Sequence, residues 1–150
     1  MRTNRAFLDT NVLLYTFDSS APEKQKRAGE AIGQRATADL VVSTQVLQEF
    51  YVNATRKLRP PMSPEEASRE VDALTSLEVV PSDARFVRSA IDLAQRVDLS
   101  LWDALVVRAA SVAGCEVLLS EDLNAGQVID GVRVENPFAE VGGAEGQTSA

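Results

Sequence analysis

Four acidic residues stand beside apolar segments of the sequence: Asp9, Glu49, Asp103 and Asp122. Apolar neighbours imply buried backbone, so a carboxylate there must be hydrogen-bonded, paired or bound to a cation. If the four converge on one cleft, like charges at short range require cations between them. Carboxylate oxygens suit hard ions such as Mg²⁺ and Mn²⁺, and one or two such ions can activate water and stabilise charge on a phosphodiester. The residues therefore predict metal-assisted hydrolysis.

Each acid also has a purely structural interpretation. Asp9 follows an apolar run and can cap the next helix through an Asx turn, as can Asn11. Glu49 can be an ordinary solvent-exposed helix residue. Asp103 stands three residues after Ser100, which is the spacing of a capping box. No single acid establishes a site, and these interpretations stay open.

The surrounding segments predict strands that alternate with helices, because short apolar runs indicate strands and apolar residues at helical spacing indicate helices. This order implies an α/β fold: a three-layer α/β/α domain with a central parallel sheet of about five strands and right-handed crossovers. We expect strands at Arg5–Leu8, Leu40–Ser43, Glu78–Pro81 (near a sheet edge), Glu116–Ser120 and, more weakly, Val132–Val134. We expect helices at Val12–Asp18, Pro22–Ala36, Gln45–Leu58, Pro64–Leu77, Asp83–Val97 and Leu101–Ala113.

These elements bring the four acids to one edge of the sheet. Asp9 and Asp122 follow strands at their carboxyl ends, where ligands bind in open α/β sheets. The helix that begins at Leu101 runs antiparallel to the fourth strand, so Asp103 near its N-terminus lies at the same edge. Glu49 comes early in the helix that leaves the second strand. The topology thus predicts a cleft with four carboxylates.

Composition limits the possible functions. The 150 residues suit one domain, which we place at residues 1–140, with a disordered tail at 141–150. Because the chain has no His, Ser-His-Asp triads, Cys-His pairs and the usual zinc sites are excluded. The net charge of −7 disfavours a conventional nucleic-acid-binding module unless bound cations reverse the local field. We expect a cytoplasmic protein with no membrane partner, because the sequence shows neither a bilayer-spanning run nor a secretory signal.

The sequence resembles the PIN-domain ribonucleases, especially the VapC-type toxins of bacterial type II toxin–antitoxin pairs. The resemblance extends from Phe7 to about Pro137 and rests on four motifs in the family's order. The motifs are Asp9-Thr10-Asn11-Val12, Glu49 on the helix after the second strand, Trp102-Asp103-Ala104 and Leu119-Ser120-Glu121-Asp122.

The resemblance implies that the first and fourth strands are adjacent and that Glu121 faces outward. It implies binding of Mg²⁺ or Mn²⁺ by all four acids, with polar support from two further residues: Asp9, Glu49, Asp103 and Asp122, with Asn11 and Ser120. It also implies an endoribonuclease that cuts RNA to leave a 5′-phosphate and a 3′-hydroxyl. The expected partners are an RNA substrate, a cognate antitoxin and a second copy of the chain in a homodimer.

Two other functions fit parts of the pattern. Phosphatases similar to the haloacid dehalogenases also have a nucleophilic Asp after the first strand. Their motif there is Asp-x-Asp, whereas this chain has Asn11 in place of the second Asp. It also has no obvious catalytic Lys after a late strand. A catalytically silent interaction domain is the other alternative, but a scaffold has no need of four carboxylates in one cleft.

Residues outside the acidic motifs give weaker expectations. We expect Trp102 in the core. Apolar residues at 13–15 and 17 exceed the needs of one small core and predict a surface for a second copy or an antitoxin peptide. Basic residues on two helices could guide RNA, although helix-dipole compensation is the better explanation for Arg56 and Lys57. The basic residues are Lys24, Lys26, Arg27, Arg35, Arg56, Lys57 and Arg59.

Overall fold

A computed structural model describes residues 4–139, so the predicted tail at 141–150 lies outside the described residues. Within them, six strands form one sheet in the order β3-β2-β1-β4-β6-β5. All neighbouring strands pair in parallel except β5 and β6. The strands are β1 (Ala6–Leu8), β2 (Leu40–Ser43), β3 (Glu78–Val80), β4 (Val117–Leu119), β5 (Val128–Ile129) and β6 (Val132–Glu135).

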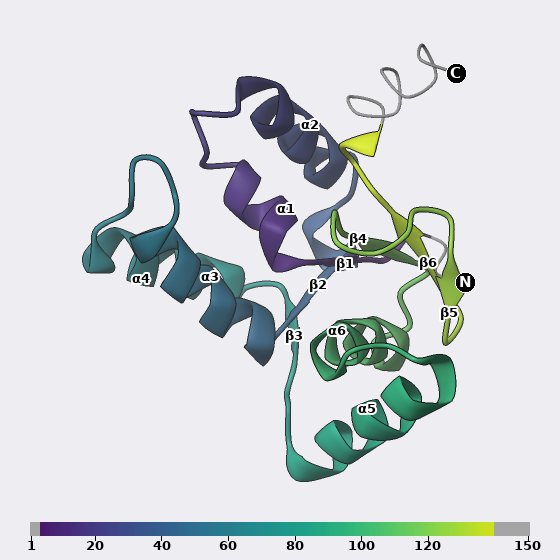
Figure 1. Ribbon diagram of the computed structural model, residues 1–150. Coiled ribbons are helices and arrows are strands. Elements are labelled where there is room, and N and C mark those ends of the chain that lie inside the picture. Colours follow the sequence, from purple (N-terminus) through teal and green to yellow (C-terminus); the bar gives the residue numbers. More distant parts are fainter. Residues whose placement is uncertain (1–3, 140–150) are drawn as a thin grey trace.

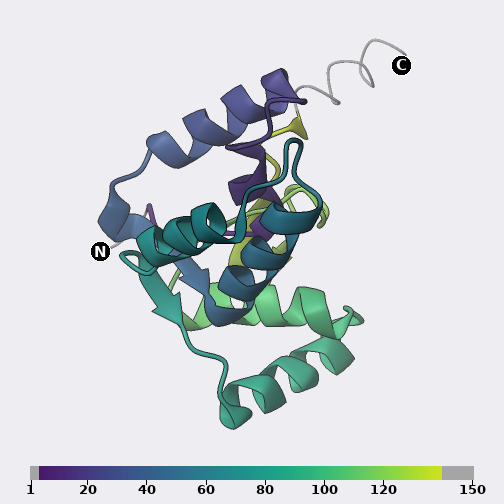
Figure 2. The same cartoon turned by 90° about the vertical axis from the view of Figure 1, so that its left-hand side faces the viewer.

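Helices cover both faces of the sheet, so the predicted α/β/α layering is confirmed (Figure 1). In that view α1 and α2 lie above the sheet and α5 and α6 below it. Figure 2 shows the α5–α6 pair as a separate layer, while α3 packs along α4. The helices are α1 (Thr10–Tyr15), α2 (Pro22–Gly33), α3 (Thr44–Arg56), α4 (Pro64–Leu74), α5 (Ala84–Val97) and α6 (Leu101–Val112), with a 3₁₀ turn at Thr37–Asp39.

Local sequence explains where the helices begin. Ser63 and Glu66 form the reciprocal hydrogen bonds of a capping box, with Pro64 in the first turn of α4. Asp83 and Ser100 cap α5 and α6 through their side chains. Strands β1, β2 and β4 are buried on both faces, as expected for central parallel strands.

The structure adds one strand to the predicted five. Strand β5 pairs antiparallel with β6 through a turn at Asp130-Gly131, where both residues have positive φ. Such a turn favours Asp-Gly, which is a strong hairpin signal. The sequence contained that signal, but Val128–Ile129 is too short to show a strand pattern of its own.

The helix boundaries differ from the predicted ones by a few residues. Helix α1 begins at Thr10, because the side chain of Asp9 caps it there, and it ends at Tyr15. Helix α2 ends at Gly33 and α4 at Leu74, which is earlier than predicted. Among residues 4–139, no helix has both the length and the apolarity needed to cross a bilayer.

Strand order reverses between β1 and β4, which pair in parallel from Ala6 with Val117 to Leu8 with Leu119. The adjacency of the first and fourth strands is therefore confirmed. At such a reversal the connections leave the sheet in opposite directions and open a crevice beyond the carboxyl ends of the strands. Asp9 and Ser120 are the first residues beyond these two ends.

Candidate functional site

Ser120 joins the two acidic motifs at the ends of β1 and β4. The backbone N–H of Asp9 donates to the Leu119 carbonyl at 3.0 Å, which extends the parallel ladder by one residue. The fully buried Ser120 hydroxyl donates to Asp9 Oδ2 at 2.7 Å and accepts from the backbone N–H of Asp122 at 3.1 Å. One hydroxyl thus fixes the positions of two of the four acids.

Asn11 makes the second connection between the same motifs. Its Nδ2 donates to Asp122 Oδ2 at 3.0 Å, and its Oδ1 accepts from the backbone N–H of Glu121 at 3.2 Å. Both polar atoms of the amide are therefore used across the strand ends. Asn11 and Ser120 thus connect the ends of β1 and β4 through their side chains, and their support of metal ligands stays a prediction.

Asp9 is the most deeply placed of the four acids. Its side chain is 7 % exposed and caps α1 by accepting from the backbone N–H of Thr10 at 2.8 Å. The capping interpretation of Asp9 is therefore confirmed, although its carboxylate accepts from the next residue and not from the residue two positions on, as in an Asx turn. Burial raises the pKa of Asp9 from 3.8 to about 6, against the hydrogen bonds from Ser120 and Thr10, and the charges of Asp122 and Glu49 raise it further. Asp9 is thus a buried carboxylate close to two others.

Glu49 is held by two donors that are not among the predicted site residues. The hydroxyl of Thr10 donates to Glu49 Oε1 at 2.7 Å, and Gln45 Nε2 donates to Oε2 at 3.0 Å. Gln45 lies one helical turn before Glu49 on α3, and Thr10 follows Asp9 directly, so spacing alone offered a signal for both. Glu49 is half-buried and does not point freely into solvent.

Asp103 lies in the first turn of α6 but is not tied to the other acids. Its backbone N–H donates to the Ser100 hydroxyl at 3.1 Å, so Ser100 is the N-cap. No reciprocal bond completes a capping box, and the Asp103 carboxylate makes no hydrogen bond or ion pair within residues 4–139. Because α6 leads into the parallel strand β4, its N-terminus lies at the carboxyl edge of the sheet.

The donor chemistry at this edge fits a hard divalent ion. Asp9, Glu49 and Asp122 supply carboxylate oxygens. Burial, and to a lesser extent repulsion from Asp122 and Glu49, raises the pKa of Asp9, and a cation would relieve that repulsion. Across residues 4–139, however, no three acidic or Cys side chains form a ready-made metal cluster. Side-chain oxygens would have to turn toward an ion for full coordination.

Glu121 forms an ion pair with Lys24 and is half-buried, rather than facing freely outward. Lys24 Nζ also donates to the Tyr15 hydroxyl at 3.2 Å and lies over the rings of Tyr15 and Phe138. The ion pair with Glu121 raises the pKa of Lys24. The Lys24 ammonium group therefore holds α2 against the loop after β4. It is not a freely exposed guide for RNA.

The core prediction for Trp102 is wrong. Its side chain is 65 % exposed on α6, next to Asp103. The buried face of that helix is supplied instead by smaller residues, among them Ala104, Val107 and Ala110. The helix packs closely on the sheet through these residues, and the indole, two positions before the first of them, stays outside.

Replacing Asp9 by Asn should stabilise the metal-free protein at neutral pH. A carboxyl whose folded pKa is raised favours folding below pH 3.8 and loses that contribution as the pH rises through about 6. The rise from 3.8 to about 6 corresponds to about 3 kcal/mol. Asp9→Asn should therefore exceed wild type in unfolding free energy at pH 7 in EDTA, and the gain should vanish near pH 4.

Urea unfolding at several pH values measures this difference. Asp72→Asn makes the same chemical change at an exposed carboxylate of α4 and should shift stability by no more than about 0.5 kcal/mol at any pH. A loss of stability in Asp9→Asn at pH 7 would mean that the charged cap on α1 outweighs the cost of burial.

Ser100→Ala and Asp103→Asn separate capping from site function at α6. Removal of the hydroxyl should lower the unfolding free energy by about 1 kcal/mol, because Ser100 is the N-cap. Asp103→Asn should change it by no more than about 0.5 kcal/mol, because that carboxylate has no hydrogen-bond partner in residues 4–139. Equal losses in thermal unfolding would assign Asp103 to the cap.

Solved structures with the same fold include several toxin–antitoxin proteins. A toxin–antitoxin complex from Klebsiella pneumoniae is 21% identical with a TM-score of 0.67, covering 89% of this chain and 98% of that one. VapC20 from Mycobacterium tuberculosis, a Sarcin-Ricin loop cleaving toxin, is 17% identical with a TM-score of 0.62, covering 78% and 89%. VapBC2 from Rickettsia felis, bound to a promoter DNA fragment, is 18% identical with a TM-score of 0.59, covering 87% and 97%.

At these identities the structural likeness shows the fold alone. No curated protein sequence matches the chain at a significant level. The PIN domain family model, in contrast, matches residues 6–129, a range that contains all four acids and both supporting residues. The chain therefore belongs to the PIN domain family.

Proposed function

We propose that this protein is a metal-dependent endoribonuclease and the toxin of a toxin–antitoxin pair. The observation that carries the proposal is the buried Asp9, whose raised pKa reflects burial beside Asp122 and Glu49 at the reversal point of a PIN-domain sheet. A protein gains nothing in stability from carboxylates placed in this way. Their placement is understandable if a cation and its chemistry require them.

Asp9, Glu49, Asp103 and Asp122 would hold Mg²⁺ or Mn²⁺, in keeping with their oxygen donors. When bound, such an ion supplies an activated water and neutralises charge that develops on the phosphate. Ser120 and Asn11 keep Asp9 and Asp122 in register across the two strand ends. Thr10 and Gln45 restrict the rotation of Glu49.

The proposed reaction is hydrolysis of an RNA phosphodiester. The oxygen of water bonds to phosphorus, the bond from phosphorus to O3′ breaks, and O3′ takes a proton. The products carry a 5′-phosphate and a 3′-hydroxyl. Support for RNA as the substrate comes from the family match and from a relative whose fold is shared and which is described as cleaving the Sarcin-Ricin loop.

The contacts of Asn11 argue against the phosphatase alternative. A haloacid-dehalogenase-like mechanism needs an acid/base group at this position. Asn11 instead uses both its amide oxygen and its amide nitrogen to bridge β1 and β4. The residue is a connector between strand ends.

Purified protein, free of partner proteins, should cleave RNA with Mg²⁺ or Mn²⁺ and lose this activity in EDTA. Asp9→Asn and Asp103→Asn should each lower the cleavage rate by more than about 100-fold, because each removes a proposed ligand. Ser120→Ala should lower it by about 10- to 100-fold, because it only positions Asp9 and Asp122. Gel assays of labelled RNA, with analysis of the product ends, measure these effects.

Asp72→Asn is the matched control, because it removes an exposed carboxylate outside the site. Activity that survives EDTA, or survives in both ligand variants, would contradict the metal mechanism. Release of inorganic phosphate from small phosphomonoesters would favour a phosphatase. A wild type with neither activity would favour a catalytically silent interaction domain.

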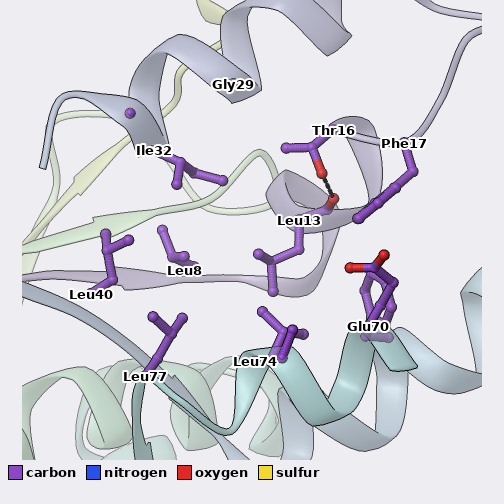
Figure 3. A pocket seen from close by; sticks show the side chains of 13 residues that line it. Leu8, Leu13, Thr16, Phe17, Gly29, Ile32, Leu40, Glu70, Leu74 and Leu77 are labelled. Carbon is purple, nitrogen blue, oxygen red and sulfur yellow. Dashed lines mark hydrogen bonds between the residues drawn. The ribbon is translucent and has the colours of Figure 1, made fainter. Parts of the chain in front are cut away.

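An apolar groove beside α1 suits an antitoxin peptide. It has a volume of about 360 Å³ and lies between the sheet and helices α1, α2 and α4 (Figure 3). Leu13 and Phe17 line it, as the expectation of a partner surface at α1 requires, whereas Leu14 and Tyr15 line a different cavity. Further walls come from Leu8, Ile32, Leu40, Leu74 and Leu77.

Gly29 has no side chain, so only backbone atoms of α2 line the groove at this position. It lies inside α2, where Gly costs about 1 kcal/mol relative to Ala. A Cβ added there would meet no atom of residues 4–139 within 4 Å, so packing among these residues does not require a glycine. Close approach of another chain to α2 would explain why that cost is tolerated. We therefore propose that an apolar segment of the antitoxin lies against Gly29.

Gly29→Ala should stabilise the free protein by up to about 1 kcal/mol, because the helix gains propensity without a clash. Gly29→Leu should fold equally well but bind the cognate antitoxin at least about tenfold more weakly, because its side chain fills the groove. Calorimetric titration measures the affinity. Lys26→Leu, exposed on the same helix and outside the groove, is the matched control. Undiminished affinity of Gly29→Leu would place the antitoxin elsewhere.

The homodimer remains a prediction. Its best structural support is a second apolar surface on α3, where Tyr51 and Val52 are 39 % and 47 % exposed. These two side chains line a shallow groove of about 430 Å³ together with Leu47, Gln48, Ser68 and Val71. Exposed apolar area of this kind is typical of contact surfaces.

A further inference from the structure

The cavity lined by Leu14 and Tyr15 opens directly beside the acidic site. It has a volume of about 190 Å³ and is lined by Asn11, Leu14, Tyr15, Asp18, Lys57 and Leu58. Asn11 is the residue that donates to Asp122, so the cavity and the site share a wall. The other walls come from the rest of α1, the turn after it and the C-terminal end of α3.

The cavity combines an apolar floor with two side chains of opposite charge, Asp18 and Lys57. Leu14, Leu58 and the Tyr15 ring offer apolar surface. The Tyr15 ring is held in place, because it packs edge-on against Phe138 with centroids 4.9 Å apart and its hydroxyl accepts from Lys24. A flat, partly polar molecule would find both stacking surface and hydrogen-bonding groups here.

Asp18 and Lys57 supply the polar groups. Oδ1 of Asp18 accepts from the backbone N–H and the hydroxyl of Ser20, which fixes the carboxylate. Its other oxygen has no hydrogen bond within residues 4–139 and can accept from a ligand. Lys57 is exposed at the C-cap of α3, where it offers a positive charge at the mouth of the cavity.

The charge around Lys57 is unusual for this molecule. The chain carries a net charge of −7, yet Arg56, Lys57 and Arg59 are all exposed here. None of the three is paired with a carboxylate in the described part of the chain. Compensation of the α3 dipole accounts for cations in the last turn, but Arg59 lies beyond the helix. A local cationic patch beside the acids suits an approaching polyanion.

We propose that this cavity binds the nucleotide next to the RNA phosphate that is hydrolysed. The base lies on Leu14, Leu58 and Tyr15, and Lys57 contacts a backbone phosphate. Asp18 accepts a hydrogen bond from an exocyclic amino group, so cytosine, adenine or guanine is preferred over uracil. This inference rests on the proposed ribonuclease function and names a substrate subsite for it.

Binding of short, labelled, single-stranded RNA in EDTA tests the subsite without cleavage. Lys57→Gln should weaken binding severalfold and reduce the slope of log K against log salt by about 0.7, because one phosphate contact is lost. Lys26→Gln makes the same charge change on α2, outside the cavity, and should leave both quantities unchanged. Equal effects of the two variants would overturn the proposal, as would a Lys57→Gln variant impaired only in antitoxin binding.

Asp18→Asn tests the base preference. Wild type should bind oligocytidine more tightly than oligouridine, and the variant should reduce that ratio, because an amide offers both a donor and an acceptor. Ser20 can still donate to the amide oxygen, so the turn keeps its hydrogen bond. No discrimination by wild type, or an unchanged ratio in the variant, would overturn the proposal. If wild type cleaves RNA with Mn²⁺ but the base preference is absent or unchanged in the variant, only the subsite proposal is wrong. If wild type binds RNA but never cleaves it, the proposed ribonuclease function is wrong.

Discussion

The hydrogen bond from Ser120 to Asp9 lies where β1 and β4 end side by side, and the same hydroxyl holds the backbone of Asp122. A fully buried hydroxyl must be satisfied, and Ser120 meets this requirement only by linking the two acidic motifs. The parallel register of two short strands therefore determines the spacing of Asp9 and Asp122. Shifting this register by one residue would turn Ser120 to the opposite face of the sheet and separate the acids.

The burial that places Asp9 beside the other acids also lowers the stability of the fold. Burial of Asp9 beside other carboxylates destabilises the metal-free fold, and neither Ser120 nor Thr10 offsets it fully, because the pKa remains raised. Apolar packing of the central strands against α6 and α3 provides the compensation, since β1, β2 and β4 are buried throughout. Sites that accept such local cost are expected where chemistry demands it. Gly29 is a second example, on the proposed partner surface.

Much of this could be predicted from the sequence. Apolar runs at 6–8, 40–43 and 117–119 stand out because parallel strands are buried on both faces, and the acids follow them directly. Side-chain partners could not be predicted in the same way: Gln45 and Thr10 reach Glu49 through rotamers that spacing permits but does not impose. The core prediction for Trp102 fails because α6 is buried only from Ala104 onward, so the first turn of the helix leaves the indole in solvent. The hairpin at Asp130-Gly131 was missed although its turn signal was present.

The central claim is that the carboxylates at the ends of β1 and β4 bind a divalent cation. Anomalous diffraction from crystals of the wild-type protein grown with Mn²⁺ tests this most directly. The account predicts a manganese peak in direct contact with Asp9 and at least one of Glu49, Asp103 and Asp122, and no such peak in Asp9→Asn crystals. A Mn²⁺-saturated crystal without a peak at Asp9, or with the ion bound only elsewhere, would contradict it.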